Sequence, residues 1–357
     1  MALGLFILFA SASLVPYQFL PQRGLMGILR LFPPALALGT FLLWSLKRLR
    51  EGKLFPSDLP LSVPIAAAIL FDFLGGLGAP DLKLAFSRLG YYAITGMLLY
   101  LVSADTFGTR KRALGFVTFA VVVASVVALY GVVEFLRNSN PLSGSVFNQE
   151  NPVFRRFGGV GGGRPRISAT IGHPSCVADY LLLTVPLALH LLVSYRNPFR
   201  RILSALSLVL ILLAIIFTFS RGGWMGTLVA ILVYLGTRGR RVFLLGLLGI
   251  SLFAGGVLMS GEVRHILRTR DPFREVLWEL KSRPPGGRID AYRITAEVLS
   301  DRPLFGVGTA NYRVVARKYG DVNEAPDNMY LRLLIENGIL SFGAMMFVFW
   351  RMLGSLR

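Results

Sequence analysis

Apolar runs long enough to cross a bilayer recur along this chain from one end to the other. Inside a bilayer every backbone polar group must find a partner within the protein, so runs of this length favour helices. Such runs occupy residues 2–20, 25–46, 59–79, 84–102, 113–135, 174–194, 200–219, 222–236, 241–260 and 329–350. The sequence therefore predicts an all-α fold, a polytopic integral membrane helical bundle of about ten transmembrane helices.

Two polar segments interrupt this pattern. The first, 137–170, is rich in Gly, Pro, Asn and Arg, and the second, 261–327, carries charges of both signs. A short helix is expected over 288–300, because Pro and Gly residues bound it on both sides. The expected domains are a bundle of about nine helices with its outer loop, a large, partly helical extracytoplasmic loop, and a final transmembrane helix with a short cytoplasmic tail, over 1–260, 261–327 and 328–357.

The distribution of Lys and Arg predicts the orientation of the helices. With a cytoplasmic N-terminus, the connections expected inside hold 15 basic residues, and the short loops on the other side hold 3. This bias is the positive-inside pattern of multi-pass membrane proteins. Both long polar segments, 137–170 and 261–327, are then expected to be extracytoplasmic.

The formal net charge of +19 invites a nucleic-acid interpretation, which the distribution of charge excludes. Most of the excess lies in the expected cytoplasmic segments, whereas 261–327 holds 12 basic and 10 acidic residues. We therefore expect a lipid bilayer, and no nucleic acid, as a partner. The single cysteine, Cys176, excludes a disulfide framework.

Arg221 is the first candidate for chemistry. It lies in the turn Phe219-Ser220-Arg221-Gly222 between two apolar runs, on the expected outer side. An arginine in so apolar a hairpin needs an anionic partner, and its planar guanidinium suits a phosphate. Lipid headgroups at the membrane interface are the alternative partner.

Two further candidates lie in or beside the second polar segment. Arg288 opens the expected short helix, where the helix N-terminus also favours an anion. Asp327 precedes Asn328 directly before the last span. Asp327 is either an N-cap of that helix or a carboxylate available as a general base at the outer membrane surface.

Metal and nucleotide cofactors are not expected. The three histidines, His173, His190 and His265, lack the spacing of a metal site, and no phosphate-binding glycine loop follows a strand. We therefore predict a metal-independent site without a cofactor.

In order along the chain, several short motifs resemble the O-antigen ligase and polymerase superfamily of bacterial envelope membrane proteins. The motifs are Gly172-His173-Pro174 with Ala178-Asp179-Tyr180-Leu181, Phe219-Ser220-Arg221-Gly222, Arg288, Pro303-Leu304-Phe305-Gly306-Val307-Gly308 with Asn311-Tyr312, and Asp327-Asn328-Met329-Tyr330-Leu331 with Glu336-Asn337-Gly338. Together they cover most of the second half of the chain, whereas the first half is similar only as a set of hydrophobic spans.

The resemblance implies a metal-independent glycosyltransferase of the bacterial inner membrane, acting in polysaccharide or lipopolysaccharide biosynthesis. Its donor would be a glycan on undecaprenyl diphosphate, and its acceptor a sugar hydroxyl on a glycan or lipid-linked sugar. By motif, Arg221 and Arg288 would bind the diphosphate and Asp327 would act as the catalytic base. Asn328, Tyr312 and His173 would contribute to substrate binding.

Two departures from the family pattern bear on the activity. Ligases carry a histidine where this chain has Asp327, which favours a polymerase, or a relative with another acceptor, over a lipid A-core ligase. Family members also continue for further spans after this motif, so a shorter variant or a truncated product is expected. A transporter or permease stays open as the alternative function, because charged residues within membrane spans would also serve one.

Overall fold

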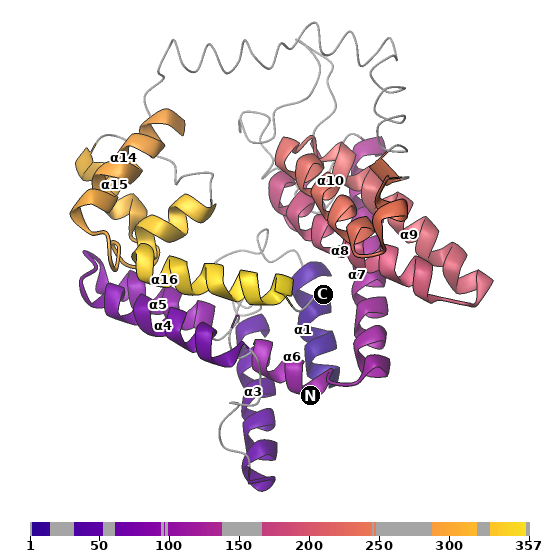
Figure 1. Ribbon diagram of the computed structural model, residues 1–357, viewed down its shortest axis with the longest axis horizontal. Coiled ribbons are helices and arrows are strands. Elements are labelled where there is room, and N and C mark those ends of the chain that lie inside the picture. Colours follow the sequence, from indigo (N-terminus) through magenta and orange to yellow (C-terminus); the bar gives the residue numbers. More distant parts are fainter. Residues whose placement is uncertain are drawn as a thin grey trace, which may run out of the picture. The chain divides into compact units, whose positions relative to one another are not determined.

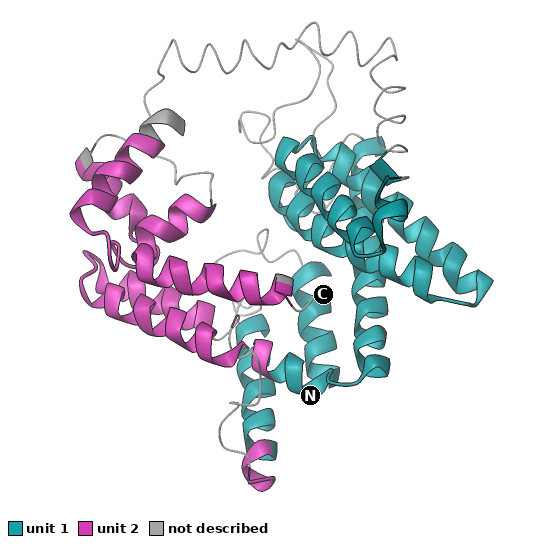
Figure 2. Cartoon of the chain, in the orientation of Figure 1, with its two compact units in different colours: residues 1–47, 102–247 teal, residues 48–101, 248–357 magenta. Residues whose placement is uncertain are grey.

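The computed structural model describes residues 2–14, 32–52, 61–93, 96, 99–137, 166–244, 246–247, 288–319 and 329–354. Within these residues the regular secondary structure is helical throughout. The chain divides into two compact units that alternate along the sequence (Figure 2): unit 1 comprises residues 1–47 and 102–247, and unit 2 comprises 48–101 and 248–357. The division expected from the sequence follows membrane topology, which is a different criterion, and it stays a prediction.

Unit 1 is a helical bundle whose centre is made by four successive long helices (Figure 1). Its helices are α1 (Ala2–Leu14), most of α3 (Phe32–Arg50), the end of α6 (Leu99–Thr106), α7 (Arg110–Arg137), α8 (Pro174–Ser194), α9 (Pro198–Phe217) and α10 (Arg221–Gly236). Short connections make α8, α9 and α10 run back and forth along one another. Alanine and branched aliphatic residues of α7, α8 and α9 form most of the buried core, including Val127, Leu181 and Ile211.

The helix ends in unit 1 are determined locally. The side chains of His173, Asn197 and Ser220 each accept a hydrogen bond from a backbone N–H in the first turn of α8, α9 and α10, respectively. In α8 and α9 a proline follows the cap, where its missing N–H costs nothing. These caps explain why the predicted starts of the three helices lie within two residues of the observed starts.

The outer surface of this bundle is suited to lipid. Residues of α9 that are spaced three and four apart expose large apolar side chains, namely Phe199, Ile202, Leu206, Val209, Leu213 and Ile216. Water disfavours a continuous apolar stripe of this length, whereas a bilayer accommodates it. Among the described helices, α7, α8, α9 and the part of α16 from Met329 to Met352 are long and apolar enough to cross a membrane. The remaining expected spans stay predictions.

Unit 2 combines a helical hairpin from the first half of the chain with the C-terminal helices (Figure 1). Its helices are α4 (Ser62–Leu77), α5 (Leu82–Tyr92), the start of α6, α14 (Arg288–Asp301), α15 (Tyr312–Tyr319) and α16 (Met329–Gly354). Helix α4 packs along α16, and α14 and α15 pack against the first turns of α16. Their buried core includes Ile294, Val298, Tyr312 and Ile335.

Most expected helices agree with the described ones, with informative differences. Helix α8 has the predicted bounds, and α14 confirms the short helix expected over 288–300. Within the span expected over 84–102, the structure describes α5, which ends at Tyr92, α6, which begins at Leu99, and π-helical conformation at Ala93 and Gly96 between them. Helix α15 was not expected, because an amphipathic helix of eight residues is hard to recognise inside a polar segment.

Candidate functional site

In unit 1, the turn that carries Arg221 is built at the junction of α9 and α10. Phe219 has a φ of 49°, a left-handed conformation that is uncommon for a bulky residue. Its ring lies near the rings of Phe135 and Trp224, with centroid distances of 6.2 and 6.4 Å. Ser220 then caps α10, and Arg221 is its first residue, with an exposed side chain. Aromatic packing therefore holds a strained turn that presents Arg221.

The segment before α8 runs alongside this turn. The backbone N–H of Ile167 donates to the Phe217 carbonyl at 3.3 Å, and Nε of Arg166 donates to the Thr218 carbonyl at 2.8 Å. Arg166 is thereby held beside the residues that lead into Arg221. Arg166 is not among the residues predicted from the sequence, because it is one of several arginines in a polar segment and no local pattern distinguishes it.

Glu134 fixes the other side of the same segment. Its carboxylate, 3% exposed at the end of α7, accepts hydrogen bonds from the Ala169 N–H at 2.7 Å and from the N–H and hydroxyl of Ser168. A buried carboxylate is stable only when donors surround it in this way. Glu134 therefore organises the backbone that carries Arg166.

The two arginines of this junction influence each other electrostatically. Burial, and to a lesser extent the positive charge of Arg221, lower the pKa of Arg166 below the ordinary value of an arginine. The fold thus holds two guanidinium groups of like charge beside one turn. Such an arrangement favours an anion.

His173 lies at the start of α8, in the same unit as Arg221. Its Nδ1 accepts a hydrogen bond from the Ser175 N–H at 3.2 Å, so it caps α8. In the neutral form this contact leaves the proton on Nε2. The role of His173 in substrate binding stays a prediction.

In unit 2, two of the sequence motifs are joined to each other by backbone hydrogen bonds. The loop 303–308 pairs with the backbone of 335–340: the N–H groups of Val307 and Gly308 donate to the carbonyls of Ile335 and Glu336 at 2.9 and 2.8 Å. In the other direction, residues 339 and 340 donate to carbonyls of the loop. This close approach requires glycine at Gly306 and Gly338, where φ is 68° and 72° and a Cβ would collide with the opposite backbone.

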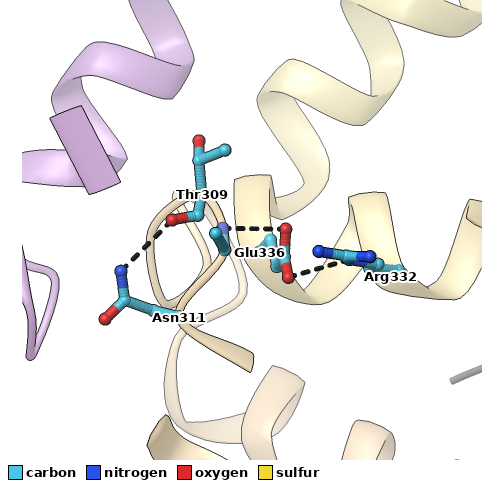
Figure 3. Close-up of polar contacts among 5 residues, drawn as sticks. Thr309, Asn311, Arg332 and Glu336 are labelled. Carbon is cyan, nitrogen blue, oxygen red and sulfur yellow. Dashed lines mark hydrogen bonds and ion pairs between the residues drawn. The ribbon is translucent and has the colours of Figure 1, made fainter. Parts of the chain in front are cut away.

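Side chains complete the attachment of this loop (Figure 3). The Glu336 carboxylate, 4% exposed, accepts a hydrogen bond from the Ala310 N–H at 2.9 Å and pairs with Arg332 at 3.0 Å. Arg332 and Glu336 lie four residues apart on α16, a spacing that favours such a pair. Asn311 donates to the Thr309 carbonyl and also exchanges hydrogen bonds with the backbone of Asp81, at the start of α5.

A carboxylate of the apolar helix α4 also has a hydrogen-bond partner here. Nδ2 of Asn337 donates to Oδ1 of Asp72 at 2.6 Å, which joins α16 to α4. Charged and polar groups within apolar helices are commonly functional. For Asp72, the contact with α16 gives a structural reason for its presence.

The remaining predicted site residues belong to unit 2. Tyr312 is 1% exposed and packs in the core, where burial raises the pKa of its hydroxyl above the ordinary tyrosine value. Arg288 is the first residue of α14, and Asp327 and Asn328 lie outside the described residues, directly before α16. Because Arg221 and His173 are in unit 1, the convergence of these residues on one site stays a prediction.

No three described His, Cys, Asp or Glu side chains gather in the way that a metal ion would need.

Long apolar helices, a lipid-compatible surface and arginines at a helix junction define a helical protein of the membrane class. Residues 180–348 match the family model described as O-antigen ligase, so this part of the chain is similar to an O-antigen ligase domain. Such a domain implies membrane glycan assembly of the ligase or polymerase type. No curated protein and no solved structure is similar enough to match.

The matched segment bears directly on the candidate residues. It includes Arg221, Arg288 and the paired loops 303–308 and 335–340, and it begins within α8. His173, Glu134 and Arg166 precede it. The junction that carries Arg221 is therefore made partly by residues inside the matched segment and partly by residues before it.

Proposed function

We propose that this protein is a membrane glycosyltransferase that polymerises or ligates a glycan, from an undecaprenyl-diphosphate-linked donor, onto a sugar hydroxyl acceptor. The reaction would take place at the outer face of the bacterial inner membrane. The observation that carries the proposal is the O-antigen ligase domain over 180–348, which contains both Arg221 and Arg288. The exposure of Arg221 at the first turn of α10 supports it.

In the proposed reaction, the acceptor oxygen forms a bond with the anomeric carbon of the donor while the bond from that carbon to the diphosphate oxygen breaks. The diphosphate leaves with the electron pair. Arg221 and Arg288 would stabilise its charge, and Asp327 would take the proton of the acceptor hydroxyl. Each of these roles suits the residue type, because a guanidinium pairs with phosphate oxygens and a carboxylate accepts a proton.

The expected orientation has support within unit 1. Arg238 contacts His190 near the end of α8, with 3.3 Å between Nη2 and Nδ1, and the guanidinium of Arg200 lies over the Tyr195 ring. These arginines are therefore at the opposite end of α8 from the Arg221 junction. A cytoplasmic end rich in arginine and an outer end that carries Arg221 agree with the positive-inside rule.

The test is deletion of the gene in the native host, complemented with variants of the full chain. Shortened surface polysaccharide after deletion means a polymerase, and long chains that stay unattached mean a ligase. Arg221→Ala and Arg288→Ala should each lower glycan transfer at least about 100-fold, with normal membrane insertion.

The matched control is Arg313→Ala, which removes an exposed arginine of α15 and should leave transfer unchanged. Full transfer by both the Arg221 and Arg288 variants contradicts the proposal. Substrate flux in proteoliposomes without lipid-linked glycan would favour a transporter instead.

A further inference from the structure

The Arg221 junction contains a second arginine, Arg166, which a hydrogen bond to the backbone holds in place. Residues 166 and 167 run beside 217 and 218, joined by the contact between the Ile167 N–H and the Phe217 carbonyl. Nε of Arg166 is anchored on the Thr218 carbonyl, and Arg221 follows three residues later. The guanidinium of Arg166 is therefore held against the turn that presents Arg221.

The anchor uses only one part of the guanidinium. In the described part of the chain, the Thr218 carbonyl is the hydrogen-bond partner of Arg166, and it is reached through Nε. The two Nη groups can then engage a planar pair of oxygens, as guanidinium groups do with phosphate. The nearby carboxylate of Glu134 accepts hydrogen bonds from Ser168 and Ala169 and so stabilises the backbone that follows Arg166.

The two glycines of the turn, Gly222 and Gly223, meet different surroundings. A Cβ on Gly223 would collide with the Cβ of Ala178, so this glycine allows α10 to pack against α8. A Cβ on Gly222 would meet no described atom within 4 Å, and its φ is not left-handed. The described residues therefore leave the surface open at Gly222, the residue that follows Arg221. The N-terminus of α10, a helix of 16 residues, adds positive potential there.

We propose that Arg166 and Arg221 together bind one phosphate group, with Arg166 as a phosphate ligand that lies outside the matched domain. An anion shared by the two guanidinium groups would offset the electrostatic repulsion between them. The inference rests on the proposed function, in which the phosphate belongs to the lipid-linked diphosphate donor. The headgroup of an anionic phospholipid offers the same phosphate chemistry, so the experiment distinguishes these two sources.

The test measures binding, not transfer. The full chain in phosphatidylcholine nanodiscs is titrated with inorganic diphosphate by calorimetry. Arg166→Gln should weaken binding about tenfold or more, because it removes charge-assisted hydrogen bonds. Arg137→Gln, which removes an exposed arginine at the end of α7, is the matched control and should bind like the unaltered protein.

A second variant separates charge from folding. Arg166→Lys keeps the charge but loses the planar group, so it should bind more weakly than the unaltered protein and more tightly than Arg166→Gln. If both Arg166 variants bind diphosphate as tightly as the unaltered protein, the proposal is overturned. Loss of binding counts as support only where the thermal unfolding midpoint of at least one variant is unchanged.

The source of the phosphate is identified in nanodiscs that contain phosphatidylglycerol. Retention of this lipid is measured by native mass spectrometry. If retention depends on Arg166, the phosphate at this site belongs to the lipid headgroup. If diphosphate still binds in the presence of the lipid, the phosphate belongs to the donor. Glycan transfer with Arg166-independent binding of diphosphate overturns this inference alone. Arg166-dependent binding without any transfer by the unaltered protein overturns the proposed function alone.

Discussion

The Glu336 carboxylate accepts a hydrogen bond of 2.9 Å from the backbone N–H of Ala310. This contact joins α16 to the loop between α14 and α15, beside the paired backbones of 303–308 and 335–340. Arg288 begins α14, and Asp327 and Asn328 directly precede α16. The contact therefore links the loop that follows α14, the helix that begins with Arg288, to α16, the helix that follows Asp327 in the sequence.

Glu336→Ala should destabilise the protein by about 2–4 kcal/mol, because it leaves the Ala310 N–H without its acceptor and removes the ion pair with Arg332. Denaturant unfolding in detergent measures the loss. The control is Glu297→Ala, which removes an exposed pair with Arg293 at 4.0 Å and should cost at most about 1 kcal/mol. Equal costs for the two variants would contradict a structural role for Glu336.

Glu134→Ala should cost about 3 kcal/mol or more, since three donors of residues 168 and 169 lose a buried acceptor. Ser125→Ala is the control on the same helix. Its hydroxyl only returns to the Val121 carbonyl, so its loss should change the unfolding free energy by less than about 1 kcal/mol. The prediction fails if Glu134→Ala unfolds at the same denaturant concentration as the unaltered protein.

Gly223→Ala should destabilise unit 1 by about 1–3 kcal/mol, because the added methyl group meets Ala178 on α8. Gly222→Ala places the same methyl group in open space and should leave stability equal or slightly higher, as alanine favours a helix more than glycine does. Thermal unfolding of the two variants side by side checks this contrast. Similar behaviour of both would show that the turn does not pack against α8 as described.

Asp327 is tested by the pH dependence of glycan transfer. Asp327→Ala should be inactive and Asp327→Asn strongly impaired, since neither side chain accepts the acceptor proton. Asp327→His should retain activity, but its transfer should fall on the acid side about two pH units higher than that of the unaltered protein. The base must be unprotonated, and a histidine ordinarily holds its proton to a higher pH than an aspartate. An active Asp327→Asn variant would leave Asp327 as a helix cap.

Several features could be predicted because they depend on neighbouring residues. The bounds of α8 follow from the cap His173 and the proline after it, and the exposed position of Arg221 follows from a turn between two apolar runs. The pair between Arg332 and Glu336 follows from their spacing on one helix. The resemblance carried by the motifs from Tyr180 onward is confirmed by the domain match.

Other features could not be predicted from local patterns. In the sequence, Glu134 is one of several charged residues within the apolar runs. Its hydrogen bonds with Ser168 and Ala169 identify its role, which is to hold the backbone before α8. The motif 303–308 has no local pattern that indicates its partner, whereas the structure shows that Gly306 allows contact with a second backbone. Tyr312, expected at the substrate, packs in the core of unit 2.

Local sequence patterns indicate where the capped helices begin, which segments are apolar, and that residues 180–348 are similar to an O-antigen ligase domain. These properties arise from caps, prolines and side-chain periodicity, which act within one or two helical turns. The position of Arg166 beside the Arg221 turn and the pairing of 303–308 with 335–340 follow from the folded structure alone. Both arrangements depend on hydrogen bonds between backbone segments that are distant in the chain, and packing of the helices brings those segments together.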